Sequence, residues 1–181
     1  MITISRFIHV NIVCRDLVAS LNFYVDVLGA KVHEIFASGD SDLRNVMGVD
    51  SRGAPSYRAA LVYWGASKRG PYLDLVQWIG GPDDGRPPLR AQDCGLVRVA
   101  LQVDDVDQVA AELADRGVPL VGPVHEAPVG PWLLRLVLCT DPDGTLIELV
   151  SFTNGETRAD RGTALTRQQL AELASHARTV D

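Results

Sequence analysis

The chain has 181 residues, of which 46% are hydrophobic and 22% are charged. These values are typical of a globular protein with a packed core, and they argue against wholesale disorder. The net charge of −6 argues against a nucleic-acid partner, since such partners favour a basic surface. No apolar run reaches the roughly 18 residues that span a bilayer, and no signal peptide is recognisable, so we expect a cytoplasmic protein with no membrane partner. The three cysteines are scattered along the chain and are expected to be free thiols.

The first part of the chain, residues 5–80, is predicted to contain one strand, one helix and three further strands. Apolar residues cluster in the strands and recur on one face of the helix, while Asp16 and Gly29 mark the two helix ends. A long polar loop is predicted over 38–56. The elements in chain order are a strand at 7–13, a helix at 17–28 and strands at 30–36, 57–64 and 72–79.

Residues 81–94 are rich in proline and glycine and are predicted to be a linker. A second part, residues 95–153, then repeats the order of the first. Its predicted elements are a strand at 96–103, a helix at 106–116 and strands at 118–122, 132–139 and 146–152. The tail, 154–181, is predicted to contain a short helix that begins with the capping pattern of Thr166 and Gln169.

The two parts agree position by position at both ends. A shift of 89 residues places His9 on Arg98 and Asp16 on Asp105, and a shift of 74 residues places Asp74 on Glu148. The copies therefore differ in loop length but share their first and last strands. Such an internal repeat predicts an α+β fold built from two tandem βαβββ modules.

Three of the equivalent positions put a polar side chain into an apolar strand. Because side chains alternate between the two faces of a strand, His9, Asp74 and Glu148 each share a face with apolar neighbours. A carboxylate in such a place is costly to bury unless it is paired, protonated or bound to a metal. With Arg98, these residues form the candidate catalytic set.

Two segments that frame this set resemble a known family. The opening HVNIVCRDLVASLNFYVDVLGAKV and the closing TDPDGTLIELVSF are similar to the first and last motifs of the vicinal oxygen chelate superfamily, which includes glyoxalase I, extradiol dioxygenases and bleomycin-binding proteins. The resemblance covers about residues 5–153. It implies that the modules form a cupped, mostly antiparallel sheet, and that the protein is a homodimer with a small-molecule ligand. It also implies a divalent metal inside the cup, held by the first and last strands of each module.

Carried over to this chain, the resemblance implies His9, Asp74 and Glu148 as metal ligands, but it places Arg98 where the metal enzymes usually have a histidine. A guanidinium stays protonated and has no lone pair to offer, so Arg98 cannot bind a cation. Three interpretations remain open. His9, Asp74 and Glu148 still hold one divalent metal, for which Mn²⁺, Fe²⁺, Mg²⁺ and Zn²⁺ are candidates. Alternatively, no metal binds, Arg98 pairs with Glu148 or Asp74, and His9 and a carboxylate perform acid–base chemistry. In the third, the cup only binds a ligand or is a structural relic.

The second interpretation predicts a small-molecule enzyme with isomerase, lyase or cyclase-like proton-transfer chemistry on a substrate that carries a carbonyl or a carboxylate. The alternatives are a sequestering protein of the bleomycin-binding type without turnover, and a metal-dependent glyoxalase or dioxygenase. Candidate substrate-binding residues are Asn11, on the face of His9, and three tryptophans that would wall the cup or serve as core residues: Trp64, Trp78 and Trp132.

Overall fold

Two four-stranded sheets make up the body of the molecule, which was analysed as a computed structural model that describes residues 3–37, 56–68, 70–80, 90–129, 132–152 and 168. The predicted short helix in the tail and the loop over 38–56 lie almost entirely outside these residues. Within the described part of the chain, no helix has both the length and the hydropathy needed to cross a bilayer.

The first sheet comes from the first module and has the strand order β1-β4-β3-β2. β1 pairs with β4 in parallel, whereas β3 pairs with β4 and with β2 in antiparallel fashion. The helical segment after β1 begins at the cap of Asp16, whose carboxylate accepts hydrogen bonds from the amides of Val18 and Ala19. The elements are β1 (His9–Val13), α1 (Leu17–Leu21), the π-helix η1 (Asn22–Val27), β2 (Lys31–Ala37), β3 (Ser56–Tyr63) and β4 (Tyr72–Ile79).

The second sheet repeats this topology with the order β5-β8-β7-β6, in which β5 and β8 are parallel. Asp105 caps its helix as Asp16 does in the first module, and Gly117 follows the helix with a φ of 72°, a conformation that favours glycine. The duplication predicted from the sequence is therefore present in the strand order. The elements are β5 (Arg98–Gln102), α3 (Val106–Asp115), β6 (His125–Val129), β7 (Trp132–Thr140) and β8 (Leu146–Phe152).

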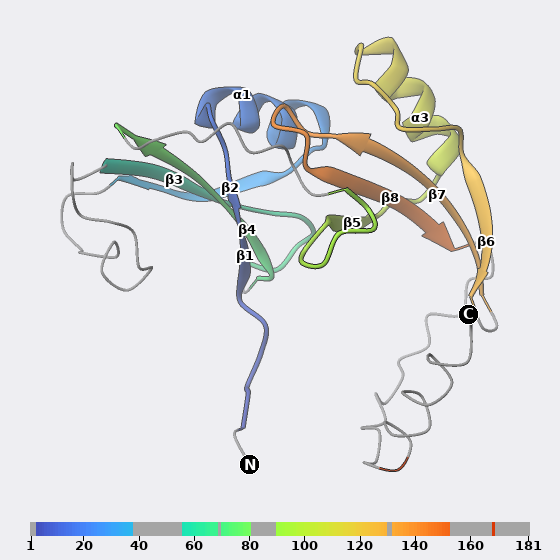
Figure 1. Ribbon diagram of the computed structural model, residues 1–181, viewed down its shortest axis with the longest axis horizontal. Helices are drawn as coiled ribbons and strands as arrows, with labels where there is room; N and C mark the ends of the chain where they lie inside the picture. Colours follow the sequence, from blue (N-terminus) through green and yellow to red (C-terminus); the bar gives the residue numbers. More distant parts are fainter. Residues whose placement is uncertain are drawn as a thin grey trace.

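Both helices pack on the same side of the two sheets, as Figure 1 shows. One continuous hydrophobic core lies there and contains side chains from both modules, including Leu75 of β4, Tyr24 of η1, Val106 of α3 and Leu149 of β8. The opposite side of each sheet has no helix over it among the described residues, and we call these sides the open faces (Figure 1). The α+β class and the tandem modules are thus confirmed, although each module forms a sheet of its own rather than a part of one sheet.

Two predicted elements differ from the observed ones. The helix predicted over 17–28 is an α-helix only to Leu21 and continues as a π-helix. The strand predicted over 118–122 is wrong, because Leu120 makes only an isolated bridge to Cys139 and the edge strand is β6, at His125–Val129. Pro128 within β6 argued against a strand there, but proline is tolerated where one side of the strand has no partner.

Candidate functional site

A cluster of polar side chains lies on the open face of the first sheet, and it includes the site residues predicted in the first module. Ile12 and Leu75 point into the core on the helix side, so strand alternation places His9, Asn11 and Asp74 on the open face. The parallel pairing sets Asn11 directly opposite Asp74 and places His9 two residues before it. The β1–β4 pairing therefore brings three polar side chains from distant parts of the sequence onto one patch.

Asp74 is the buried member of this patch, with 9% of its surface exposed. One of its oxygens, Oδ2, accepts a hydrogen bond from Nδ2 of Asn11 at 3.0 Å, while the other, Oδ1, is buried and has no hydrogen-bond partner among the described residues. Burial raises the pKa of the Asp74 carboxyl above its ordinary value, and the charge of His9 and the hydrogen bond from Asn11 oppose this rise. The site thus holds a carboxyl oxygen that lacks the donor a buried acceptor normally has.

The open face of the second sheet carries the equivalent pair, Arg98 and Glu148. Nε of Arg98 lies 2.6 Å from Oε2 of Glu148, and the arginine side chain is 50% exposed whereas the glutamate is 11% exposed. Ala100 stands opposite Glu148 in the parallel register, just as Asn11 stands opposite Asp74. Each module therefore sets a basic residue of its first strand beside a carboxylate of its last strand.

The three residues implied as metal ligands do not form one set within a single chain. No three histidine, cysteine, aspartate or glutamate side chains among the described residues come together in a way that could hold a metal ion. His9 and Asp74 lie on the first sheet, whereas Glu148 lies on the second and is already paired with a permanent cation. The donors that the described residues of one chain supply consequently do not fit a resident divalent cation.

The three tryptophans that were predicted to line the cup lie in different parts of the fold. Trp78 lies on the open face of the first sheet, where it contacts the ring of Tyr57 with a centroid separation of 5.4 Å. Trp64 lies on the helix side, packs against the core and donates a hydrogen bond from Nε1 to the carbonyl of Leu28 at 2.7 Å, so it does not share a face with Asp74. The side chain of Trp132 lies outside the described part of the structure.

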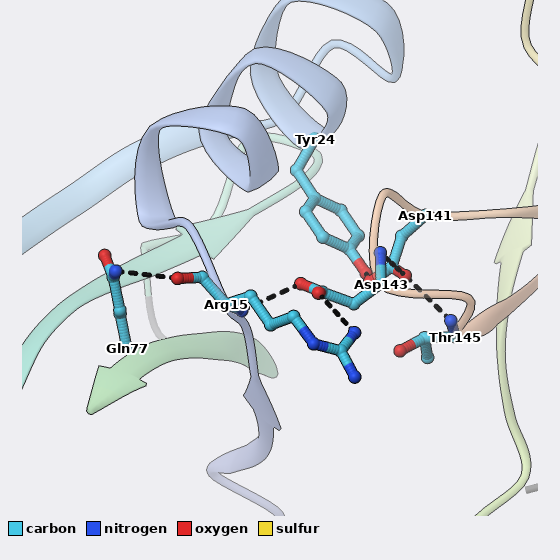
Figure 2. Close-up of polar contacts among 6 residues, drawn as sticks. All are labelled: Arg15, Tyr24, Gln77, Asp141, Asp143 and Thr145. Atoms are coloured by element: carbon cyan, nitrogen blue, oxygen red, sulfur yellow. Dashed lines mark hydrogen bonds and ion pairs between the residues drawn. The ribbon is translucent and has the colours of Figure 1, made fainter. Parts of the chain in front are cut away.

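A polar joint between the modules was missed by sequence analysis. The hydroxyl of Tyr24 donates to Oδ2 of Asp141 at 2.9 Å, and both side chains are buried. Asp141 Oδ1 accepts hydrogen bonds from the amides of Asp143 and Thr145, which fix the turn between β7 and β8. Figure 2 shows the Tyr24 ring extending from its helix toward this turn. Tyr24 and Asp141 lie in the two segments that carry the family resemblance, but nothing in their spacing indicates that their side chains meet.

Arg15 adds a second connection to the same turn. Its amide donates to Oδ2 of Asp143 and its Nη1 donates to Oδ1, each at 3.1 Å (Figure 2). Its carbonyl accepts a hydrogen bond from Nε2 of Gln77, and Oε1 of the same Gln77 side chain accepts one from the amide of Leu17. The start of α1 is thereby tied both to its own sheet and to the second module, and the contacts of Arg15 and Tyr24 with residues 141–145 are called the module joint below.

Comparisons with known proteins identify the family. The model of the Glyoxalase/Bleomycin resistance protein/Dioxygenase superfamily matches residues 6–149. The uncharacterized protein YaeR of Escherichia coli strain K12 is 26% identical over 152 residues, which cover 82% of this chain and 98% of YaeR. A glyoxalase family protein from Bacillus cereus has the same fold, with a TM-score of 0.69 and 20% identity over 83% of this chain and 95% of that one. One from Enterococcus faecalis has a TM-score of 0.55 and 20% identity over 81% of this chain and 98% of that one. The chain therefore belongs to the glyoxalase, bleomycin resistance protein and dioxygenase superfamily.

Proposed function

We propose that this protein is a small-molecule enzyme of the superfamily that moves a proton on a substrate with a carbonyl or a carboxylate group. The observation that carries the proposal is the ion pair between Arg98 and Glu148 at 2.6 Å. It puts a fixed positive charge at the position where the family resemblance implies a metal ligand. A guanidinium can stabilise a carboxylate or a developing oxyanion, which a divalent cation would otherwise do.

The two modules would then divide the chemistry. His9, exposed on the open face of the first sheet, is suited to accept and return a proton because an imidazole ring has one nitrogen that can donate and one that can accept. The unpartnered Oδ1 of Asp74 accepts a hydrogen bond from the substrate. Arg98 binds the anionic group, and Glu148 holds the guanidinium in place. We infer no step through a metal, because the donors in the described part of one chain do not fit one.

Both halves of the site need to face one substrate, and this leads us to propose a homodimer. In one chain, the pair of His9 and Asp74 and the pair of Arg98 and Glu148 belong to different sheets. A second copy would place the open face of its second sheet over the open face of the first. Sedimentation velocity at several protein concentrations tests this arrangement, and a strictly monomeric protein that retains activity would contradict it.

Proton transfer can be tested without knowledge of the natural substrate. The protein is incubated in D₂O with pyruvate, 2-oxobutyrate and phenylpyruvate, and exchange of the hydrogens next to the carbonyl is followed by NMR. We expect catalysed exchange that survives treatment with a chelator and falls by about 10²-fold or more in His9→Asn. His125→Asn, a change at the far edge strand of the second sheet, serves as the control and should leave the rate unchanged.

Two other results would support competing functions. Saturable binding of these acids without exchange would favour a sequestering protein of the bleomycin-binding type. Loss of exchange on chelation, with recovery on addition of Mn²⁺ or Zn²⁺, would show that a second copy completes a metal site with His9, Asp74 and Glu148. Either outcome would contradict the metal-free proton transfer proposed above.

A further inference from the structure

The open face of the second sheet is apolar beside its ion pair. Val137 and Cys139 of β7 point into the core, so alternation places Leu134, Leu136 and Leu138 on the open face. These leucines are only half-buried. Leu138 stands opposite Glu148 in the antiparallel register, and Leu136 and Leu134 follow it along the strand.

Val150 and Phe152 continue this face along β8, since they follow Glu148 at intervals of two residues and pair with Leu136 and Leu134. Phe152 is exposed, whereas Val150 is buried. Two such intervals along a strand cover about 13 Å. A strip of apolar side chains therefore runs away from the Arg98–Glu148 pair along two neighbouring strands, which Figure 1 shows side by side. We call it the leucine strip.

The guanidinium at the end of the strip still has N–H donors that Glu148 does not use. It contacts Glu148 through Nε, and the guanidinium makes no hydrogen bond or ion pair with any other residue in the described ranges. Guanidinium groups offer five N–H donors, so an arginine bound through Nε still presents its two terminal nitrogens to a carboxylate. The 50% exposure of the side chain leaves these nitrogens accessible.

Resting on the function proposed above, we infer that the second sheet binds a carboxylate with an unbranched or planar apolar body, in which Arg98 takes the carboxylate and the leucine strip takes the body. Charge and shape select this class together. A free inorganic anion would leave the strip uncovered, and a neutral hydrocarbon would leave the guanidinium without its second partner. Glu148 acts as a positioning residue, because it holds Arg98 beside the strip.

Titration calorimetry with a homologous series tests the chemistry of the ligand. Butyrate, hexanoate and octanoate are compared with octanol and octylamine, which keep the apolar body but lose the negative charge. We expect the affinity to rise about fourfold for each methylene that the strip covers, since burial of a methylene is worth about 0.8 kcal/mol. Octylamine should bind at least tenfold more weakly than octanoate, because its charge repels the guanidinium.

Two variants test the two parts of the site. Arg98→Gln should weaken octanoate binding by tenfold or more, whereas Arg90→Gln, which removes an exposed arginine paired with Asp93, should have no effect. Arg98→Gln also leaves the Glu148 carboxylate without its partner, which can destabilise the fold. A second variant therefore keeps this ion pair. Ala100→Phe adds a ring at an exposed strand position opposite Glu148 and should block the carboxylate while the fold is kept. Val18→Phe, at an exposed position on α1, is its control.

The outcomes separate this inference from the proposed enzyme activity. Octanoate that binds with the expected chain-length dependence, in a protein that catalyses no exchange in D₂O, would support the carboxylate site and overturn the enzyme. Equal affinity for octanoate and octylamine, or binding that Ala100→Phe leaves intact, would overturn the carboxylate site. So would the absence of any octanoate binding to the parent chain.

Discussion

Asp74 illustrates how a candidate functional carboxyl can work against stability. It is 9% exposed, and only one of its oxygens has a donor in the described part of the chain. Burial raises its pKa, which means that the folded chain holds this proton more tightly than the unfolded chain does. The ionised form therefore costs folding free energy at every pH above the ordinary pKa of an aspartate, and this cost disappears as the pH falls below it.

Asp74→Asn should consequently stabilise the protein at neutral pH. The amide keeps the acceptor for Asn11 and removes the desolvated charge, so we expect a gain of about 1 kcal/mol in the free energy of unfolding. Urea unfolding at pH 7 and at pH 4 measures it, and the gain should shrink at the lower pH because the parent carboxyl is then protonated. A variant less stable than the parent at pH 7 would show that the carboxylate is well solvated or paired in solution.

Tyr24 offers the opposite case, a buried polar group whose partner is present. Burial, together with the charge of Asp141, raises the pKa of the Tyr24 phenol well above its ordinary value, so the hydroxyl remains a donor. Tyr24→Phe leaves the buried Asp141 without this donor and should destabilise the chain by about 2 kcal/mol. Tyr63→Phe is the matched control, since Tyr63 is also buried and its hydroxyl makes no hydrogen bond to any described residue. Equal losses in the two variants would contradict a stabilising role of the joint.

Helix caps are the elements that the sequence predicted best. Their positions before an apolar periodic segment predict Asp16 as the cap of the first helix and either Asp104 or Asp105 as the cap of the second. In the structure Asp16 and Asp105 are the caps, and each accepts two amide hydrogen bonds at the start of its helix. Asp105→Ala should therefore cost about 1 kcal/mol of stability. Asp104→Ala removes the neighbouring exposed carboxylate, which accepts no hydrogen bond from the helix, and should change the midpoint of thermal unfolding very little. Similar midpoints for both variants would contradict the assignment of the cap.

Strand pairing was less accessible to sequence analysis than strand position. Alternation of apolar residues located β4 and β8 to the residue, because that signal is local. The edge strand β6 was missed, because Pro128 suppresses the local signal and its pairing with Leu133 depends on the rest of the sheet. For the same reason, the pairing of Arg98 with Glu148 remained one of two options until the register of β5 and β8 was known.

At the scale of the whole molecule, the duplication fixes where the candidate residues lie but not which of them share a site. A shift of 89 residues correctly predicted that His9 and Arg98 hold equivalent places, and the matching registers of β1–β4 and β5–β8 confirm it. Among the described residues, His9, Asp74 and Glu148 do not come together within one chain, because the module joint sets the two sheets next to each other rather than face to face (Figure 1). No pattern within one chain encodes that arrangement, because it depends on contacts between distant segments.

The shared core and the module joint predict that the two modules unfold as one unit, and the cysteines make this measurable. Cys14 belongs to the first module and Cys139 to the second, and both are buried, whereas Cys94 is exposed. In a Cys94→Ser background, thiol labelling across a urea series, read by mass spectrometry of the two peptides, should give the same midpoint for Cys14 and Cys139. Tyr24→Phe should lower both midpoints together, since the hydroxyl it removes joins the modules. Exposure of Cys139 at a lower urea concentration than Cys14 would show that the second module opens alone, and the joint would then not couple the two halves of the site.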